Sequence, residues 1–269
     1  MFQSPNIYKG ENPIPESIDT MSSHVELPER QKGLSPIERV VDAYVSPEQT
    51  FLDIRRNASW WLPFLIGVAI SLAFTFAVDK QIGFDKVAEA SINRSSQAQE
   101  RLSGVPEAQR EQAIHTIATT TRIISYAYPV VSLLVSLLAA AILMASFNLG
   151  LGAKVKYKEY FAVWFYAGLP LVLKFLLAAI AIFAGVSAEQ FDIQNPVGTN
   201  IAWFLSSDLP QWLRTLLTSA DIFTIWTVIL LIVGCATVAR VKRSSAAVVV
   251  IGWWVLIILG STAVAAFQG

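Results

Sequence analysis

One apolar stretch, residues 160–186, constrains the fold of this chain more than any other feature. Its sequence is YFAVWFYAGLPLVLKFLLAAIAIFAGV, with Lys174 as its one charged residue. At a rise of about 1.5 Å per residue, a helix of this length crosses a hydrocarbon core of roughly 30 Å with some tilt. We expect Gly168 and Pro170 to kink that helix. Such a segment cannot fold in water, so it predicts a membrane protein.

The composition agrees with this class. Hydrophobic residues make up 54% of the 269 residues and charged residues 15%, well below the roughly 25% usual in soluble domains. The 20 basic and 20 acidic residues cancel, so no overall field draws the chain to nucleic acid. HExxH and CxxC motifs are absent, and the histidines are His24 and His115. We therefore expect no metal, no cofactor and no catalytic residue.

Five apolar segments are long enough to cross a bilayer. The first opens with paired tryptophans, which are typical of the membrane interface, and ends before Asp79. Pro129 marks a kink near the start of the second. The predicted spans are residues 60–78, 123–149, 160–186, 222–239 and 246–267. The sequence therefore predicts an all-α fold, an integral membrane bundle of five transmembrane helices within residues 59–269.

Basic residues in the short connections predict the orientation of this bundle. They fall on one side of it: Arg55 and Arg56 before the first span, Lys154, Lys156 and Lys158 before the third, and Arg240, Lys242 and Arg243 between the last two. Lys and Arg are enriched in cytoplasmic loops. The long loops 79–122 and 187–221 fall on the opposite side. We therefore expect a cytoplasmic N-terminus and an outside C-terminus.

The N-terminal region divides into a tail and two short helices. Residues 1–34 carry four prolines and no apolar periodicity, which predicts disorder. A capping box at Ser35 then starts one helix, and Ser46 starts another. Residues 35–58 are predicted to be amphipathic cytoplasmic helices. They would lie against the membrane or the bundle, or would form a platform for protein docking, because amphipathic helices look alike in both roles.

Both long loops are predicted to contain helices. In the first, we expect Pro106 to open a helix that runs into the second span. In the second, Asp208 and Pro210 supply a cap and a first-turn residue, followed by an apolar stripe at helical spacing: Leu209, Trp212, Leu213, Leu216 and Leu217. This interfacial stripe is expected to lie flat on the outer membrane surface. A re-entrant segment is the alternative, although Arg214 would be costly at depth.

Lys174 is the one charged residue inside the predicted spans. A lone lysine about 20 Å into a core of about 30 Å is energetically expensive. It can pair with Asp221 at the start of the fourth span, or with Asp79 at the end of the first. We favour Asp221, because a helix N-terminus stabilises negative charge. Snorkelling along the methylene stem and a transported-ion site are the alternatives.

Three short motifs occur in a fixed order along the chain. They are PEQTF at 47–51, YAGLP at 166–170 and SADIFTIW at 219–226. Together they resemble the Yip domain family, the Ypt/Rab-interacting membrane proteins, over about residues 47–267. The resemblance implies five spans and a cytosolic N-terminus. The Asp-Leu-Tyr-Gly-Pro signature of the trafficking branch is absent, and the chain is more similar to bacterial members. The resemblance thus implies a bacterial cytoplasmic membrane and does not support binding of a Rab-type GTPase.

Two classes of function follow from these features. The resemblance and the lack of a catalytic constellation favour a non-enzymatic scaffold or adaptor that organises protein partners, copies of itself or lipid. The alternative is a small transporter or channel that uses the Lys174 region, because a charged residue and helix breakers within a span are typical of transporters. No inverted repeat is visible in the sequence, which favours the scaffold. The lipid bilayer is the partner that the composition itself requires.

Overall fold

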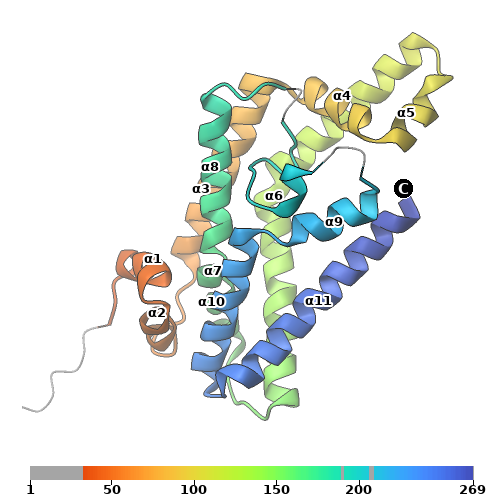
Figure 1. The fold of residues 1–269 in the computed structure, drawn as a ribbon. Coiled ribbons are helices and arrows are strands. Elements are labelled where there is room, and N and C mark those ends of the chain that lie inside the picture. Colours follow the sequence, from red (N-terminus) through yellow and green to blue (C-terminus); the bar gives the residue numbers. More distant parts are fainter. Residues whose placement is uncertain (1–32, 189–190, 206–208, 269) are drawn as a thin grey trace, which may run out of the picture. The chain divides into compact units, whose positions relative to one another are not determined.

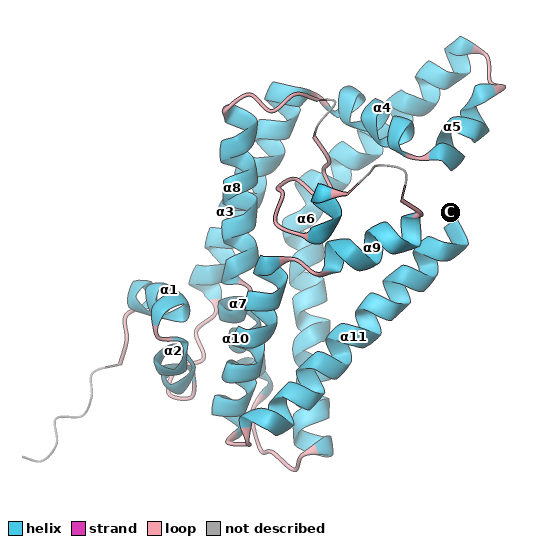
Figure 2. Ribbon diagram, viewed as in Figure 1, coloured by secondary structure: helices cyan, strands magenta, loops and turns pink. Residues whose placement is uncertain are grey.

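The computed structural model describes residues 33–188, 191–205 and 209–268, and the regular structure in these ranges is helical (Figure 2). Residues Leu34–Gly269 form one unit. In that part of the chain, an isolated bridge between Asn200 and Asp221 is the one β-type contact. The predicted all-α fold is confirmed. Most of the predicted disordered tail, residues 1–32, and the predicted cap Asp208 lie outside the described residues.

The helices are labelled in Figure 1. The first group is α1 (Pro36–Val45), α2 (Pro47–Ile54), α3 (Trp61–Ala77), the π-helix η1 (Val78–Ile82), α4 (Phe84–Arg94) and α5 (Ser96–Ser103). The second group is α6 (Glu107–Gly150), α7 (Tyr157–Ala167), α8 (Leu169–Phe183), the 3-10 helix η2 (Ile201–Phe204), α9 (Gln211–Ser219), α10 (Ile222–Ala239) and α11 (Arg243–Gln268).

Five helices in the described ranges are long and apolar enough to cross a membrane, as predicted. They are Trp61–Ile82, Glu107–Gly150, Tyr157–Phe183, Ile222–Ala239 and Arg243–Phe267. The third consists of α7 and α8, which meet at Gly168. Pro170 lies in the first turn of α8, where its missing N–H costs no helical hydrogen bond. The interruption of this helix therefore falls beside Gly168 and Pro170.

α6 is a single helix of 44 residues that begins just after Pro106 and continues through Pro129. A proline within a helix leaves the carbonyl four residues earlier without its backbone donor. That carbonyl belongs to Ser125, and the buried hydroxyl of Thr75 in α3 donates to it, with 3.4 Å between the oxygens. A neighbouring helix thus supplies the hydrogen bond that the proline cannot, as hydrocarbon surroundings require.

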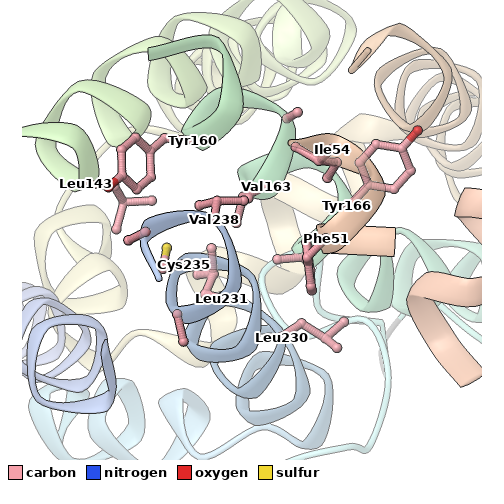
Figure 3. Close-up of a cluster of buried hydrophobic side chains, with 14 of the residues drawn as sticks. Phe51, Ile54, Leu143, Tyr160, Val163, Tyr166, Leu230, Leu231, Cys235 and Val238 are labelled. Carbon is pink, nitrogen blue, oxygen red and sulfur yellow. The ribbon is translucent and has the colours of Figure 1, made fainter. Parts of the chain in front are cut away.

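Buried apolar side chains form two cores along the bundle. The basic-end core lies by the basic loops 151–156 and 240–242 and joins α1, α2, α6, α7, α10 and α11 (Figure 3). The α4–α5-end core joins α3, η1, α4, α6 and α8 with the loop residue Phe191. On α8, Lys174 lies between Leu169, which belongs to the basic-end core, and Ala178, which belongs to the α4–α5-end core. The charged pair predicted from the sequence is therefore placed between the two cores.

Candidate functional site

Lys174 of α8 and Asp221 at the start of α10 form an ion pair. Nζ is 2.8 Å from Oδ2, and the side chains are 13% and 1% exposed. The hydroxyl of Thr199 donates to the same carboxylate oxygen at 2.5 Å. The other oxygen accepts hydrogen bonds from the backbone N–H groups of Phe223 and Thr224. Asp221 is therefore both the partner of a buried cation and the N-cap of α10.

The protonation state of Asp221 follows from these contacts. Burial alone would raise the pKa of its carboxyl group, but the hydrogen bonds from Lys174 and Thr199 outweigh burial and hold the pKa below its usual range. Asp221 is therefore ionised at neutral pH. Its charge compensates that of Lys174, which would be costly by itself at this depth.

A loop between α8 and α9 supports the pair from one side. Asn200 forms the bridge with Asp221, and the backbone N–H of Ile222 donates to the carbonyl of Thr199 at 3.1 Å. Asn195 and Asn200 are buried and exchange two amide hydrogen bonds, with N···O distances of 3.3 and 2.5 Å. These loop residues were not predicted to belong to the site. Their signal in the sequence is a polar run, QNPVGTN, between two spans.

Asp79, the alternative partner of Lys174, contacts other groups. Its Oδ2 atom is 3.0 Å from Nη2 of Arg122 and 3.2 Å from the hydroxyl oxygen of Tyr126. Both partners belong to α6, so these contacts connect the end of the first membrane helix to the second. The structure thus brings Lys174 to Asp221 rather than to Asp79.

A cavity of about 430 Å³ adjoins the ion pair. Its lining is largely polar and includes Lys174, Asn195, Thr215, Thr218, Thr224 and Ser261. α8 continues from Lys174 to Phe183, about 14 Å further along the helix axis, whereas α10 begins at the level of Lys174. The junction of α9 and α10 is therefore recessed from the end of α8. The cavity thus reaches the ion pair at a level that α8 passes as an apolar helix.

α9 forms one wall of this cavity and carries most of the predicted interfacial stripe. Within the stripe, Trp212 and Leu216 are exposed, whereas Leu209, Leu213 and Leu217 are half-buried. α9 packs against η2 and α11. Its polar residues Gln211, Arg214 and Thr215 line the cavity. The helix thus separates a surface with exposed apolar side chains from a polar recess.

The hairpin of α1 and α2 is a second candidate region. Arg39 and Asp53 form an ion pair across it, with Nε 2.5 Å from Oδ2 and side chains only 4% and 7% exposed. Arg39 also donates to the carbonyl of Asn57 at 2.9 Å, and the hydroxyl of Thr50 donates to the carbonyl of Arg39 at 3.0 Å. Buried polar contacts therefore hold the two helices together as one rigid hairpin.

The hairpin docks on the bundle at a defined depth. The hydroxyl of Tyr44 donates to the carbonyl of Leu169 at 2.9 Å, and its ring meets Trp226 edge-on with centroids 5.6 Å apart. Burial raises the pKa of Tyr44 to about 12. At the basic end, Glu48 pairs with Arg243 at 2.7 Å. The hairpin therefore extends from the basic end to the interruption between α7 and α8.

α1 has apolar residues on two faces. On one face, Ala43 is buried in the basic-end core, and Val40 and Tyr44 pack against it. Four further apolar residues of the hairpin are exposed, and we call them the exposed row: Ile37, Val41 and Val45, spaced four residues apart on α1, and Leu52 on α2. Contacts within the described chain bury the first face and leave this row exposed. An exposed apolar surface of this kind is typical of a site that binds lipid or a protein partner.

A model of the Yip1 domain matches residues 41–264. The chain belongs to the Yip1 domain family. The matched range begins within α1, ends within α11 and contains Lys174 and Asp221. With its five membrane-crossing helices, this Yip1-domain chain is a multi-pass integral membrane protein. No curated protein and no solved structure matches it.

Across residues 33–188, 191–205 and 209–268, no three His, Cys, Asp or Glu side chains are grouped to hold a metal ion. Cys235 is buried in the basic-end core. The Lys174 and Asp221 charges neutralise each other. The site thus consists of a polar recess at one end and an exposed apolar row near the other.

Proposed function

We propose that this Yip1-domain protein is a non-enzymatic scaffold or adaptor, and that the exposed row of the hairpin contacts a protein partner or a second copy of the chain. The observation that carries the proposal is that this row lies on a rigid hairpin. The buried pair of Arg39 and Asp53 holds the two helices of the hairpin together, and the hydrogen bond from Tyr44 to Leu169 fixes the hairpin on the bundle. A surface fixed before binding loses little conformational entropy when a partner docks.

The proposal includes an orientation. The basic loops support a cytoplasmic basic end, because Lys and Arg are enriched in cytoplasmic loops. The hairpin then lies in the cytoplasmic half of a bilayer, which we propose is a bacterial cytoplasmic membrane. The C-terminus then lies outside, and the stripe on α9 contacts headgroups at the outer surface, where Trp212 is well suited to the interface.

Site-specific photocrosslinking in native membranes tests this function. A photoreactive residue at Val41, in the exposed row, is expected to capture a discrete protein. The same probe at Leu256, an exposed apolar residue of α11, is the matched control and is expected to capture lipid. Val45→Ser should reduce capture at Val41 without lowering the melting temperature, since Val45 is 71% exposed. Capture of lipid alone at both positions would exclude a protein-binding row.

A small transporter is the second candidate, and the polar cavity beside Lys174 favours it. A transporter requires several polar groups around one cavity within the membrane. Purified protein in liposomes measures this directly as solute flux. Flux that Lys174→Ala abolishes, together with no captured protein at Val41, would replace the scaffold with a transporter. The scaffold predicts no flux above that of empty liposomes.

A further inference from the structure

A second cavity, of about 680 Å³, lies next to the one beside Lys174. Its walls come from α4, α5, α6, α9 and the end of α11. The two cavities have four lining residues in common: Asp192, Gln194, Gln211 and Arg214. The two spaces therefore adjoin at these shared residues, and we describe them as two chambers of one recess. We name the larger one the arginine chamber, after Arg94, Arg101 and Arg214 in its lining.

Among its described lining residues, the arginine chamber has more basic than acidic side chains. Its three arginines come from three different helices, and the described lining residues include one acid, Asp192. Asp192 already accepts a hydrogen bond from the backbone N–H of Gln194 at 3.0 Å. Arg94 donates one of its five N–H groups to the carbonyl of Phe191 at 2.8 Å. Most of its donors are therefore still available to a ligand.

Three arginines around one space favour an anionic ligand. Like charges around one space repel each other, and a space lined by cations concentrates anions. The guanidinium group matches the oxygens of a phosphate with two parallel hydrogen bonds, which a lysine cannot do. A phosphate group offers several acceptor oxygens at once and can therefore engage more than one of these arginines.

Apolar side chains border the same chamber. Leu102 of α5, Ile117 of α6 and Phe267 of α11 belong to its lining, and Phe267 is 92% exposed. Only 6% of the apolar window of α11 is buried, so in a bilayer this helix is surrounded by acyl chains. A ligand with both a phosphate and an apolar part fits such surroundings better than a free inorganic ion does.

We propose that the arginine chamber binds the phosphate group of an anionic lipid headgroup. Arg94, Arg101 and Arg214 hold the phosphate, and the apolar border faces the glycerol and acyl chains. This site lies at the end of the bundle opposite the exposed row of the hairpin and does not depend on the scaffold function. A free phosphate compound shares the recognised group and is the other source that the experiment distinguishes.

Thermal unfolding of the full-length protein in detergent tests the site. Phosphatidylglycerol is titrated in one arm, phosphatidylcholine in the second and inorganic phosphate in the third. The melting temperature should rise saturably with phosphatidylglycerol and not with the net-neutral lipid. A rise of equal size with inorganic phosphate would assign the site to free phosphate compounds. No saturable rise in any arm would overturn the proposal.

Substitutions of residues that line the arginine chamber test whether phosphatidylglycerol binds there. Arg101→Gln and Arg214→Gln should each weaken the phosphatidylglycerol response at least tenfold, and Arg101→Lys should restore only part of it, because lysine lacks the paired geometry. Lys86→Gln is the matched control: it removes one positive charge from exposed α4 surface outside the cavity lining. Its response should equal that of the unmodified protein. Equal losses in Lys86→Gln and Arg101→Gln would show diffuse attraction and refute the site. Arg101 is exposed, so its variants should fold.

Discussion

The two apolar cores of this protein differ in size and in what lies beside them. The basic-end core contains large side chains with no exposed surface: Phe51, Tyr160 and Tyr166 among them. The α4–α5-end core is smaller, and its residue Val87 also lines the cavity of about 680 Å³. Large interlocking side chains leave few voids. Stability should therefore depend more on the basic end, and ligand binding on the other.

The two buried ion pairs also differ in whether a cavity adjoins them. Arg39 and Asp53 are sealed within the hairpin beside the basic-end core. Lys174 and Asp221 lie between the cores, and Lys174 lines the polar cavity. Both pairs place opposite charges in contact, but only the second is accessible to polar ligands. Removing one partner should therefore cost more unfolding free energy in the pair of Arg39 and Asp53 than in the pair of Lys174 and Asp221.

The largest effect is expected from breaking the sealed pair. Asp53→Leu leaves the Arg39 guanidinium buried without a counter-charge, which should cost about 3–5 kcal/mol of unfolding free energy. Arg39→Leu with Asp53→Leu should cost clearly less than the two single changes added together. Chemical denaturation of the detergent-solubilised protein measures all three values.

The pair of Glu48 and Arg243 provides the matched control. It joins the same hairpin to α11, but its side chains are 59% and 63% exposed. An exposed ion pair contributes about 0.5 kcal/mol or less, so Glu48→Gln should be nearly neutral. Similar losses from Asp53→Leu and Glu48→Gln would contradict the view that the basic end is sealed.

Breaking the pair between the cores should have a smaller effect. Lys174→Ala and Asp221→Ala are each expected to cost about 2–3 kcal/mol, because water in the adjoining cavity screens the charge that is left. The double change should again cost less than the sum, since neither charge is then left alone. Strict additivity in this double-mutant cycle would mean that Lys174 is solvated without Asp221.

The membrane helices could be predicted from the sequence because the hydropathy of each segment depends only on its own residues. Each apolar run must form its own backbone hydrogen bonds in lipid, so length and composition suffice to identify a helix. The end of the first span was less visible: Asp79 and Lys80 belong to η1, which continues the helix to Ile82. Charged residues usually predict the end of a membrane helix. Here the helix continues past them, because Asp79 contacts Arg122 and Tyr126 of α6 and Lys80 is exposed.

The contacts around Lys174 were harder to predict from the sequence. Asp79 and Asp221 were the candidate partners because they are acids that adjoin spans on that side. Asp221 was favoured because a helix N-terminus stabilises negative charge. The roles of Thr199 and Asn200 depend on how the loop folds onto α10. Likewise, Arg39 and Asp53 lie on adjacent helices, and their burial results from tertiary docking. Long-range packing of this kind leaves no periodic signal.

Alanine at two helix glycines, Gly234 and Gly67, should have smaller effects than breaking either buried ion pair. It compares packing inside and outside the basic-end core. A Cβ atom at Gly234 of α10 would lie 2.7 Å from a methyl carbon of Val163 and 2.9 Å from the ring of Phe51. Overpacking of a filled core costs about 1–3 kcal/mol, while alanine gains about 1 kcal/mol over glycine within a helix. Gly234→Ala should therefore lose about 1 kcal/mol net.

Gly67 of α3 is the matched position outside that core. A Cβ atom there would lie 3.6 Å from its nearest neighbour, a methyl carbon of Val172, which is ordinary van der Waals contact. With no overpacking, the helix preference of alanine should dominate, and Gly67→Ala should gain about 0.5–1 kcal/mol. The two substitutions should therefore change the unfolding free energy in opposite directions. A gain at Gly234 equal to that at Gly67 would mean that α2, α7 and α10 can separate at little cost, and that the basic end is no more tightly packed than the rest of the bundle.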